Sequence, residues 1–227
     1  MNKEEFKEKL KEHNIILNKE MENQFEKYYE LIVKYNQVMD LTAVEPSKIY
    51  ERHFLNSLTI AFNNDFNYLK VCDVGAGAGF PSIPLKIIFP NMKLTIMDPL
   101  LKRMEFLKII IHELDLKDVT LLCSRAENAS TDYFEQFDIV TARAVAKLNI
   151  LVELVAQLIK VNGCFIAMKG EKGLEELHEA ENALKICNLS LIKKEFFEPS
   201  INLTFLKTKT ISKKYPRNYA QIKSHPL

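Results

Sequence analysis

The amino-acid sequence predicts a doubly wound α/β fold: a parallel sheet with helices on both faces, a helical extension before it and an antiparallel hairpin at its end. Three observations support this. The first 66 residues have helical periodicity, strand-like and helical segments alternate between residues 69 and 187, and two strand-like runs then follow directly. The chain has 227 residues, of which 47% are hydrophobic and 27% charged, and is therefore long enough to bury a core.

The first 66 residues are expected to form helices. The apolar residues that recur at helical spacing are Phe6, Leu10, Phe25, Tyr28, Tyr29, Ile32 and Val33. Residues 45–47 include Pro46 and interrupt the pattern. A further helix is then expected to carry His53 and Ser57, and a polar run at 63–65 closes this region.

Beyond residue 66, β-rich runs alternate with helical segments. The predicted strands are 69–74, 94–98, 119–123, 138–142 and 164–168. The predicted helices are 81–88, 101–114, 148–160 and 174–187. Such alternation implies right-handed crossovers and therefore a parallel sheet.

The end of the chain departs from this alternation. Residues 189–197 and 201–209 are strand-like runs joined by a turn at 198–200, so the last strand is expected to enter the sheet antiparallel. Five alternating units followed by a hairpin are the strand plan of the seven-stranded, Rossmann-like methyltransferase fold. The predicted division is a helical region at 1–66, a catalytic domain at 67–210 and a basic tail at 211–227.

A glycine-rich loop gives the strongest local signal. It follows the first predicted strand and opens a helix, where an α/β sheet binds its ligand. The loop has the frame Asp73-x-Gly75-x-Gly77-x-Gly79. Asp98 follows the second predicted strand, where a carboxylate can accept the ribose hydroxyls of an adenosine.

The loop favours S-adenosylmethionine over a dinucleotide. The dinucleotide fingerprint requires a glycine where Phe80 stands. Asp73 would repel a pyrophosphate but suits the cationic sulfonium and amino group of S-adenosylmethionine. A nucleotide-binding Rossmann protein of another kind is the alternative.

Motifs that the sequence lacks restrict the choice of methyl acceptor. Residues 138–144 do not contain the Asn/Asp-Pro-Pro-aromatic turn common among enzymes that methylate exocyclic amines. No cysteine lies on the expected active loops, as methylation of pyrimidine carbon 5 would require. Ring nitrogen 7 of guanine fits, because it attacks through a free lone pair and loses no proton, and catalysis then reduces to proximity and orientation.

Several stretches together resemble the bacterial small-subunit ribosomal RNA guanine methyltransferases, also called the glucose-inhibited division protein B family. The stretches are 35–42, 52–58, the glycine loop through Pro84, 102–103, 125–127, 141–144, 168–170 and the ending at 213–217. The resemblance implies methylation of nitrogen 7 of a guanine in the decoding-region (530) loop of 16S rRNA, within the 30S subunit. Two residues depart from the family pattern. Members usually have Asp where Asn56 stands, and often Ser where Pro99 stands. Because Asn carries no charge, an ionic role at position 56 is in doubt.

The resemblance implies donor contacts at Gly75, Phe80, Ala126, Glu127 and Arg143. The spacing of the glycine loop and its acidic residues adds Asp73, Gly77 and Asp98 to the expected donor site. Arg143 is also the expected catalytic residue. If it donated to the guanine nitrogen it would consume the attacking lone pair, so it should hold a phosphate, the neighbouring guanine oxygen or the donor's carboxylate. An ion pair between elements is its structural alternative.

The expected RNA contacts are Arg52, His53, Lys169, Lys213, Lys214 and Arg217. For Arg52 and His53, a helix-docking hydrogen bond and a catalytic role are equal alternatives. Lys102 and Arg103 could also meet RNA phosphate, with a solvated helix face as the equal alternative. From Pro199 to Leu227 the chain has six basic residues and no Asp or Glu, which suits phosphate binding, although a solvated terminus is also possible. Lys207 is counted among these six.

The remaining expectations concern cysteines, metal, compartment and assembly. The four cysteines are neither closely spaced nor near a His cluster, so core packing is expected for them and no metal. No apolar run approaches the roughly 20 residues that cross a bilayer, which favours a cytoplasmic protein without membrane contact. A monomer is also expected. The alternatives to an rRNA enzyme are a methyltransferase of a small molecule or protein, and a non-catalytic rRNA-binding assembly factor.

Overall fold

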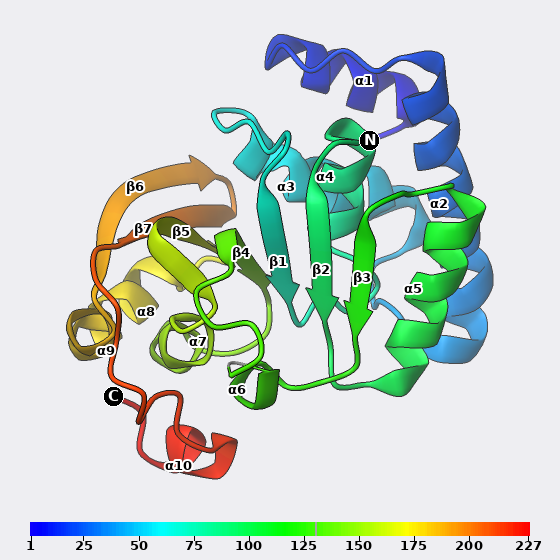
Figure 1. The fold of residues 1–227 in the computed structure, drawn as a ribbon. Helices are drawn as coiled ribbons and strands as arrows, with labels where there is room; N and C mark the ends of the chain where they lie inside the picture. The colour runs from blue at the N-terminus through cyan, green and yellow to red at the C-terminus, as the bar shows by residue number, and fades with distance from the viewer. Residues whose placement is uncertain (130) are drawn as a thin grey trace. The chain divides into compact units, whose positions relative to one another are not determined.

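The computed structural model describes residues 1–129 and 131–227, and hydrogen bonding arranges seven strands in the order β3-β2-β1-β4-β5-β7-β6 (Figure 1). The strands are β1 Lys70–Val74, β2 Lys93–Met97, β3 Val119–Leu122, β4 Phe137–Arg143, β5 Ile159–Lys169, β6 Leu189–Phe197 and β7 Ser200–Lys207. The pairs β2–β3, β1–β4 and β4–β5 are parallel, whereas β7 is antiparallel to both β5 and β6. This mixed sheet confirms the predicted α/β class and the antiparallel hairpin.

The chain falls into two compact units. Unit 1 contains Met1–Tyr68 and Ala76–Cys123, and unit 2 contains Leu69–Gly75 and Ser124–Leu227. The division into regions 1–66, 67–210 and 211–227 stays a prediction.

Unit 1 begins with the helices that the apolar periodicity predicted. The helices of this unit are α1 Lys3–Glu12, α2 Lys19–Met39, α3 Asn56–Leu58, α4 Ser82–Ile88 and α5 Leu101–Glu113, with 3-10 turns at Pro46–Lys48 and Thr59–Ala61 and a π-helix at Tyr50–Leu55. Asn2 and Asn18 cap α1 and α2 by accepting hydrogen bonds from first-turn N–H groups. Phe54 of the π-helix packs against Phe25 and Tyr28 of α2, with ring centroids 5.3 and 5.2 Å apart. These aromatic contacts bury the apolar face of α2.

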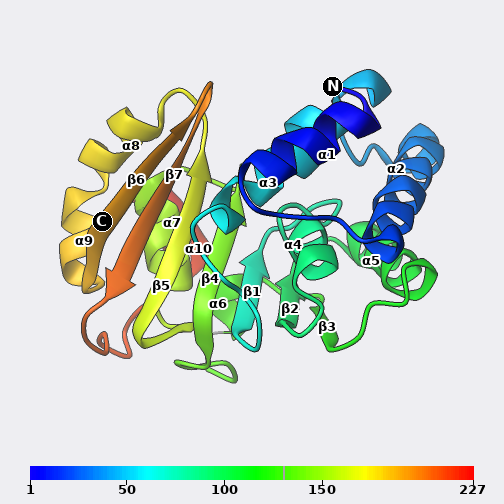
Figure 2. The same cartoon turned by 90° about the horizontal axis from the view of Figure 1, so that it is seen from above.

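Unit 2 contains β1, β4 to β7 and, among the described residues, five further helices. The helices are α6 Ala126–Ala129, α7 Leu148–Val155, α8 Gly173–Glu179, α9 Glu181–Ile186 and α10 Tyr219–Ser224. Figure 2 shows β4, β5, β7 and β6 side by side, with α9 against β6. Helix α7 is apolar almost all round and is buried along most of its length.

Two predictions about helices in unit 2 were wrong in detail. The helix expected at 148–160 ends at Val155, and β5 begins at Ile159, because the β-branched residues Ile159 and Val161 favour extended backbone. The helix expected at 174–187 is two helices separated at Ala180, with no glycine or proline to signal the break. A helix that the sequence did not predict, α10, lies within the expected basic tail.

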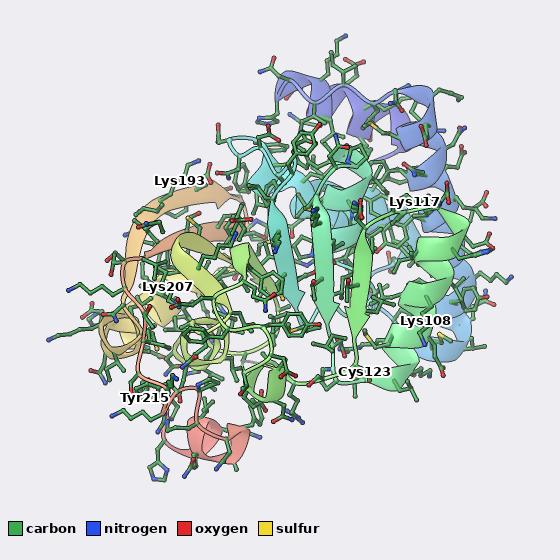
Figure 3. The ribbon with its side chains drawn as sticks, in the orientation of Figure 1. Lys108, Lys117, Cys123, Lys193, Lys207 and Tyr215 are labelled. Atoms are coloured by element: carbon green, nitrogen blue, oxygen red, sulfur yellow. The ribbon has the colours of Figure 1, made fainter. Side chains whose placement is uncertain are left out.

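The cysteines were also only partly predicted. Cys72 and Cys187 are buried, as expected, and burial raises the pKa of the Cys187 thiol to about 12. Cys164 is half-buried, and Cys123, at the end of β3, is exposed (Figure 3). Core packing is therefore wrong for Cys123, because it follows β3, which is the edge strand of the sheet and has no fully buried residue.

Candidate functional site

The first half of the predicted donor loop lies in unit 2, at the end of β1. Asp73 is fully buried and accepts a hydrogen bond from Thr141 Oγ1 at 3.1 Å, and Thr141 lies beside it on β4. Gly75 has a φ of 73°, and a Cβ there would lie 2.6 Å from Val145 Cγ2. A side chain is therefore excluded at Gly75 both by its backbone conformation and by its neighbour.

The second half lies in unit 1, where Asp98 is tied to the glycine loop. The Asp98 carboxylate is fully buried and accepts the N–H groups of Gly77, at 3.1 Å, and Leu100, at 2.9 Å. Arg103 Nη1 lies 3.2 Å from Asp98 Oδ2, and the Arg103 side chain is 41% exposed. An ionised carboxylate has about four acceptor positions, and these three contacts leave one on Asp98 Oδ1. Because the side chain is fully buried, a ligand hydroxyl would reach that position only after a neighbouring group moves.

Helices of unit 1 hold the loop after Gly77. The Tyr28 hydroxyl of α2 donates to the carbonyl of Ala78 at 2.7 Å. A Cβ on Gly79 would lie 2.5 Å from Ile83 Cγ1 and 2.9 Å from the Tyr28 hydroxyl oxygen. The N-terminal helices thus set the path of the loop, which explains the need for Gly79.

His53 supports the same loop from the π-helix. Its ring stacks on Phe80, with centroids 4.3 Å apart, and is 8% exposed. The Nε2 atom of His53 lies 2.6 Å from Thr42 Oγ1. Thr42 is itself held by the Asn36 side-chain amide, which makes two hydrogen bonds of 2.9 Å with the Thr42 backbone. This geometry favours the helix-docking interpretation of His53. A direct contact of His53 with RNA stays a prediction.

The residue types in each half of the site suit an adenosine-type donor. Gly77 has a φ of 60°, and a Cβ there would meet no atom within 4 Å, so the loop backbone borders open space. The buried Asp98 carboxylate lies next to this backbone and suits a ribose hydroxyl. In unit 2, the buried Asp73 carboxylate suits a cationic group.

The parallel strands of unit 2 bring further predicted residues to one edge of the sheet. Arg143 is the last residue of β4 and pairs in register with Met168, which precedes Lys169 at the end of β5. Lys169 is 7% exposed, donates to the Ala146 carbonyl at 2.7 Å and lies 2.7 Å from Glu176 Oε2. An RNA phosphate could reach the Lys169 ammonium only by opening this ion pair.

Comparison with known proteins identifies the chain. Residues 21–203 match the family model described as GidB, rRNA small subunit methyltransferase G. A Staphylococcus carnosus (strain TM300) protein named ribosomal RNA small subunit methyltransferase G is 46% identical, over 97% of this chain and 96% of the relative. A Staphylococcus aureus (strain Newman) protein of the same name is 44% identical over the same shares.

The chain belongs to the small subunit rRNA methyltransferase G family. Solved structures agree at the level of the fold. A SAM-dependent methyltransferase from Aquifex aeolicus superposes with a TM-score of 0.59 at 17% identity, covering 78% of this chain and 98% of that one. A ribosomal protein L11 methylase from Lactobacillus delbrueckii gives 0.56 at 20% identity, covering 75% and 83%. Family membership confirms the expected methyltransferase and, with it, the S-adenosylmethionine cofactor.

The remaining predicted RNA contacts of this family member differ in exposure. Arg52, Lys213 and Lys214 are exposed. Arg217 is instead paired with the fully buried Glu153 of α7 at 2.6 Å. The expected phosphate contact of Lys207, which Figure 3 labels, was wrong. Its side chain is fully buried on β7, where it donates to the carbonyls of Ala156 and Ile159.

Several residues that shape the site were missed from the sequence. Tyr28 and Thr42 read as helix-face and loop residues, and only the structure brings them to the glycine loop and to His53. Glu153 looks like one more solvated glutamate on a helix, yet it is fully buried. An acidic residue on an otherwise apolar helix was the available signal, since a buried charge requires a partner.

No group of three or more His, Cys, Asp or Glu side chains that could hold a metal ion occurs among the residues that the structure describes. Likewise, none of the described helices is long and apolar enough to cross a membrane.

Proposed function

We propose that this protein transfers the methyl group of S-adenosylmethionine to ring nitrogen 7 of a guanine in the decoding-region loop of 16S rRNA. The observation that carries the proposal is the glycine loop with its two buried carboxylates, Asp73 and Asp98, in a chain of the rRNA methyltransferase G family. The relatives are named for the ribosomal RNA small subunit, which supports 16S rRNA in the 30S subunit as substrate.

The donor, when bound, supplies a methyl group on a positively charged sulfur. Asp98 would accept a ribose hydroxyl, and the loop around Gly77 would lie against the donor. Asp73 would face the cationic groups, and Thr141 holds its carboxylate in place through the hydrogen bond described above. The family pattern assigns the adenine to Ala126 and Glu127, which open α6.

For the acceptor, Arg143 would act by orientation. Nitrogen 7 must keep its lone pair for attack, so the guanidinium should hold the neighbouring guanine oxygen, a phosphate or the donor's carboxylate. Arg52, Lys213 and Lys214 would contact RNA phosphates from the surface. We further propose that the enzyme acts as a monomer in the cytoplasm, where 30S subunits are found.

The decisive experiment is incubation with labelled donor and either 30S subunits or naked 16S rRNA from a strain that lacks this activity. Label should appear on one guanine, and the modified base should be 7-methylguanine by nuclease digestion and mass spectrometry. Label on protein, on a small molecule or on another ring position would overturn the proposal. RNA binding without any methyl transfer would instead support the assembly factor.

A further inference from the structure

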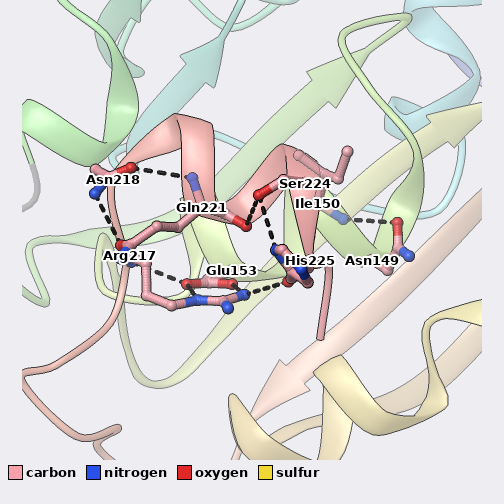
Figure 4. Close-up of polar contacts among 8 residues, drawn as sticks. All are labelled: Asn149, Ile150, Glu153, Arg217, Asn218, Gln221, Ser224 and His225. Atoms are coloured by element: carbon pink, nitrogen blue, oxygen red, sulfur yellow. Dashed lines mark hydrogen bonds and ion pairs between the residues drawn. The ribbon is translucent and has the colours of Figure 1, made fainter.

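The C-terminal segment, residues 211–227, is fastened to α7 by a buried ion pair. Arg217 donates its backbone N–H and Nε to Glu153 Oε1, both at 2.9 Å, and Nη2 to Glu153 Oε2 at 2.6 Å (Figure 4). The Glu153 side chain is fully buried, whereas Arg217 is 25% exposed. Because an unpartnered buried carboxylate is strongly unfavourable, the folded state of unit 2 requires this segment to stay in place.

Other contacts strengthen the attachment. The Gln157 amide, just after α7, donates to the carbonyls of Ser212 and Tyr215. Ile211 and Ile222 are buried at 3% and 0% exposure. The segment is therefore part of the packed unit and not a solvated terminus.

From this attachment, α10 reaches the start of α6. Asn218 caps α10 by accepting the Gln221 N–H at 3.0 Å, and Tyr219 is the first residue of the helix. The Arg125 guanidinium carbon lies 4.8 Å from the centroid of the Tyr219 ring, a cation–π contact.

Arg125 determines where α6 begins. Its carbonyl accepts the N–H groups of Asn128, at 3.1 Å, and Ala129, at 3.2 Å. A helix of four residues has too few internal hydrogen bonds to fix its own position. The turn that presents Ala126 and Glu127 thus depends on what holds Arg125.

We infer that Tyr219 and Arg217 are positioning residues of the donor site: Arg217 fastens the C-terminal segment to α7, and Tyr219 holds Arg125 so that Ala126 and Glu127 meet the adenine. The inference rests on the proposed function. It gives the C-terminal segment a role on the donor side, in addition to any phosphate contact of Lys213 and Lys214. The family match ends at residue 203, before this segment.

The test compares three variants by calorimetry with S-adenosylhomocysteine and by their thermal unfolding midpoints. Tyr219→Ala removes the ring and should weaken binding about two- to fivefold, the range of an exposed cation–π contact. Tyr219→Phe keeps the ring and should restore the parent affinity. Gln221→Ala, in the same helix with its side chain toward Asn218, is the matched control and should bind like the parent.

A second measurement uses the reciprocity of linked equilibria. If α10 favours donor binding, the donor should slow hydrogen exchange of the α10 amides in the parent by a comparable factor, and this protection should shrink in Tyr219→Ala. Folded Tyr219→Ala with parent affinity and parent protection would overturn the inference. So would a loss of rRNA affinity alone, which would make Tyr219 and Arg125 an RNA contact.

The two proposals fail in distinguishable ways. A folded parent protein that does not bind S-adenosylhomocysteine overturns the proposed function and this inference together. A parent that binds it, with all three variants indistinguishable from it, overturns only the role of Tyr219. Arg217→Lys, which keeps the charge but loses the paired hydrogen bonds, should weaken donor binding in the same direction as Tyr219→Ala.

Discussion

Among single residues, Asp98 is expected to have the largest effect on the donor. Asp98→Ala removes the proposed ribose acceptor and leaves the N–H groups of Gly77 and Leu100 without their carboxylate. A hydrogen bond to a charged group contributes about 1.5–3 kcal/mol, so affinity for S-adenosylhomocysteine should fall about tenfold to a hundredfold by calorimetry. NAD should not bind to either protein.

Glu105→Ala is the matched control for that substitution, because it removes an exposed carboxylate from α5 of the same unit. It should leave donor affinity unchanged. Parent-like affinity in a folded Asp98→Ala protein would eliminate Asp98 as the ribose acceptor.

Two glycines of the loop should separate folding from binding. Gly77→Ala places a methyl group in open space at a positive φ, so it should cost about 1–2 kcal/mol of stability but weaken donor binding by obstructing the loop surface. Gly75→Ala collides with Val145 and should destabilise more strongly. Urea unfolding and calorimetry measure the two effects.

A double substitution checks the steric argument for Gly75. Adding Val145→Ala removes the colliding methyl groups and should recover part of the stability lost in Gly75→Ala. An additive loss in the double variant would show that backbone strain alone is responsible. If Gly77→Ala loses no more free energy of donor binding than free energy of unfolding, the result would argue against a ligand that lies on the loop.

At the scale of an element, β7 is anchored by the buried ammonium of Lys207. It lies 3.0 Å from Glu135 Oε1 and donates to two carbonyls, while burial lowers the pKa of Lys207 below its ordinary value. Lys207→Met should lower the free energy of unfolding by about 3 kcal/mol in urea titrations, because it leaves these groups without a donor. Lys209→Met, at an exposed position, is the control and should be nearly neutral.

The salt dependence of RNA binding distinguishes this role from a phosphate contact. Lys207→Met should leave the slope of log affinity against log salt unchanged, whereas Lys213→Ala should reduce it by about one charge. If Lys207→Met is stable and reduces the slope of log RNA affinity against log salt, Lys207 contacts RNA phosphate after all.

Asp138 links three strands of unit 2 and should matter mainly in acid. Burial acts to raise its pKa, but hydrogen bonds from Lys160 and from the Lys70 N–H outweigh burial, so the pKa lies below the ordinary 3.8. The unfolded chain then takes up the proton at higher pH than the folded protein does. The stabilisation is therefore complete above pH 3.8 and is lost as pH falls through the folded pKa.

Asp138→Asn should accordingly lower stability by about 1 kcal/mol at neutral pH and by less near pH 3. Urea titrations at the two pH values measure this difference. A loss of the same size at both would mean that the carboxylate charge contributes nothing.

At the scale of the whole molecule, the sequence predicted the helices and strands better than the side-chain contacts between them. Alternation of short β-rich runs with helical segments is a local property, so the strands and the terminal hairpin were found within a few residues. The break at Ala180 and the burial of Lys207 depend on tertiary contacts that leave no local pattern. The burial of Glu153 had a local signal, its place on an otherwise apolar helix, but its partner Arg217 did not. For the same reason the glycine loop was found from its spacing, while its supports Tyr28 and Thr42 were not.

The chemistry of the complete enzyme leads to a test of pH dependence. Attack by guanine nitrogen 7 releases no proton from the nucleophile, so the reaction needs no general base. His53 is buried against Phe80 and hydrogen-bonded to Thr42, which suits a support of the loop better than a base. With donor and rRNA saturating, the single-turnover rate should therefore stay nearly flat between about pH 6.5 and 8.5.

Two substitutions should then separate support of the loop from orientation of the acceptor. His53→Ala should lower stability or substrate affinity while keeping a flat pH profile, whereas Arg143→Ala should lower the rate of the bound complex through lost orientation. A parent rate that rises about tenfold per pH unit, with a slope that disappears in His53→Ala, would make His53 a base. The acceptor would then have to lose a proton on methylation, and since nitrogen 7 of guanine has none to lose, the guanine assignment would fail with the flat profile.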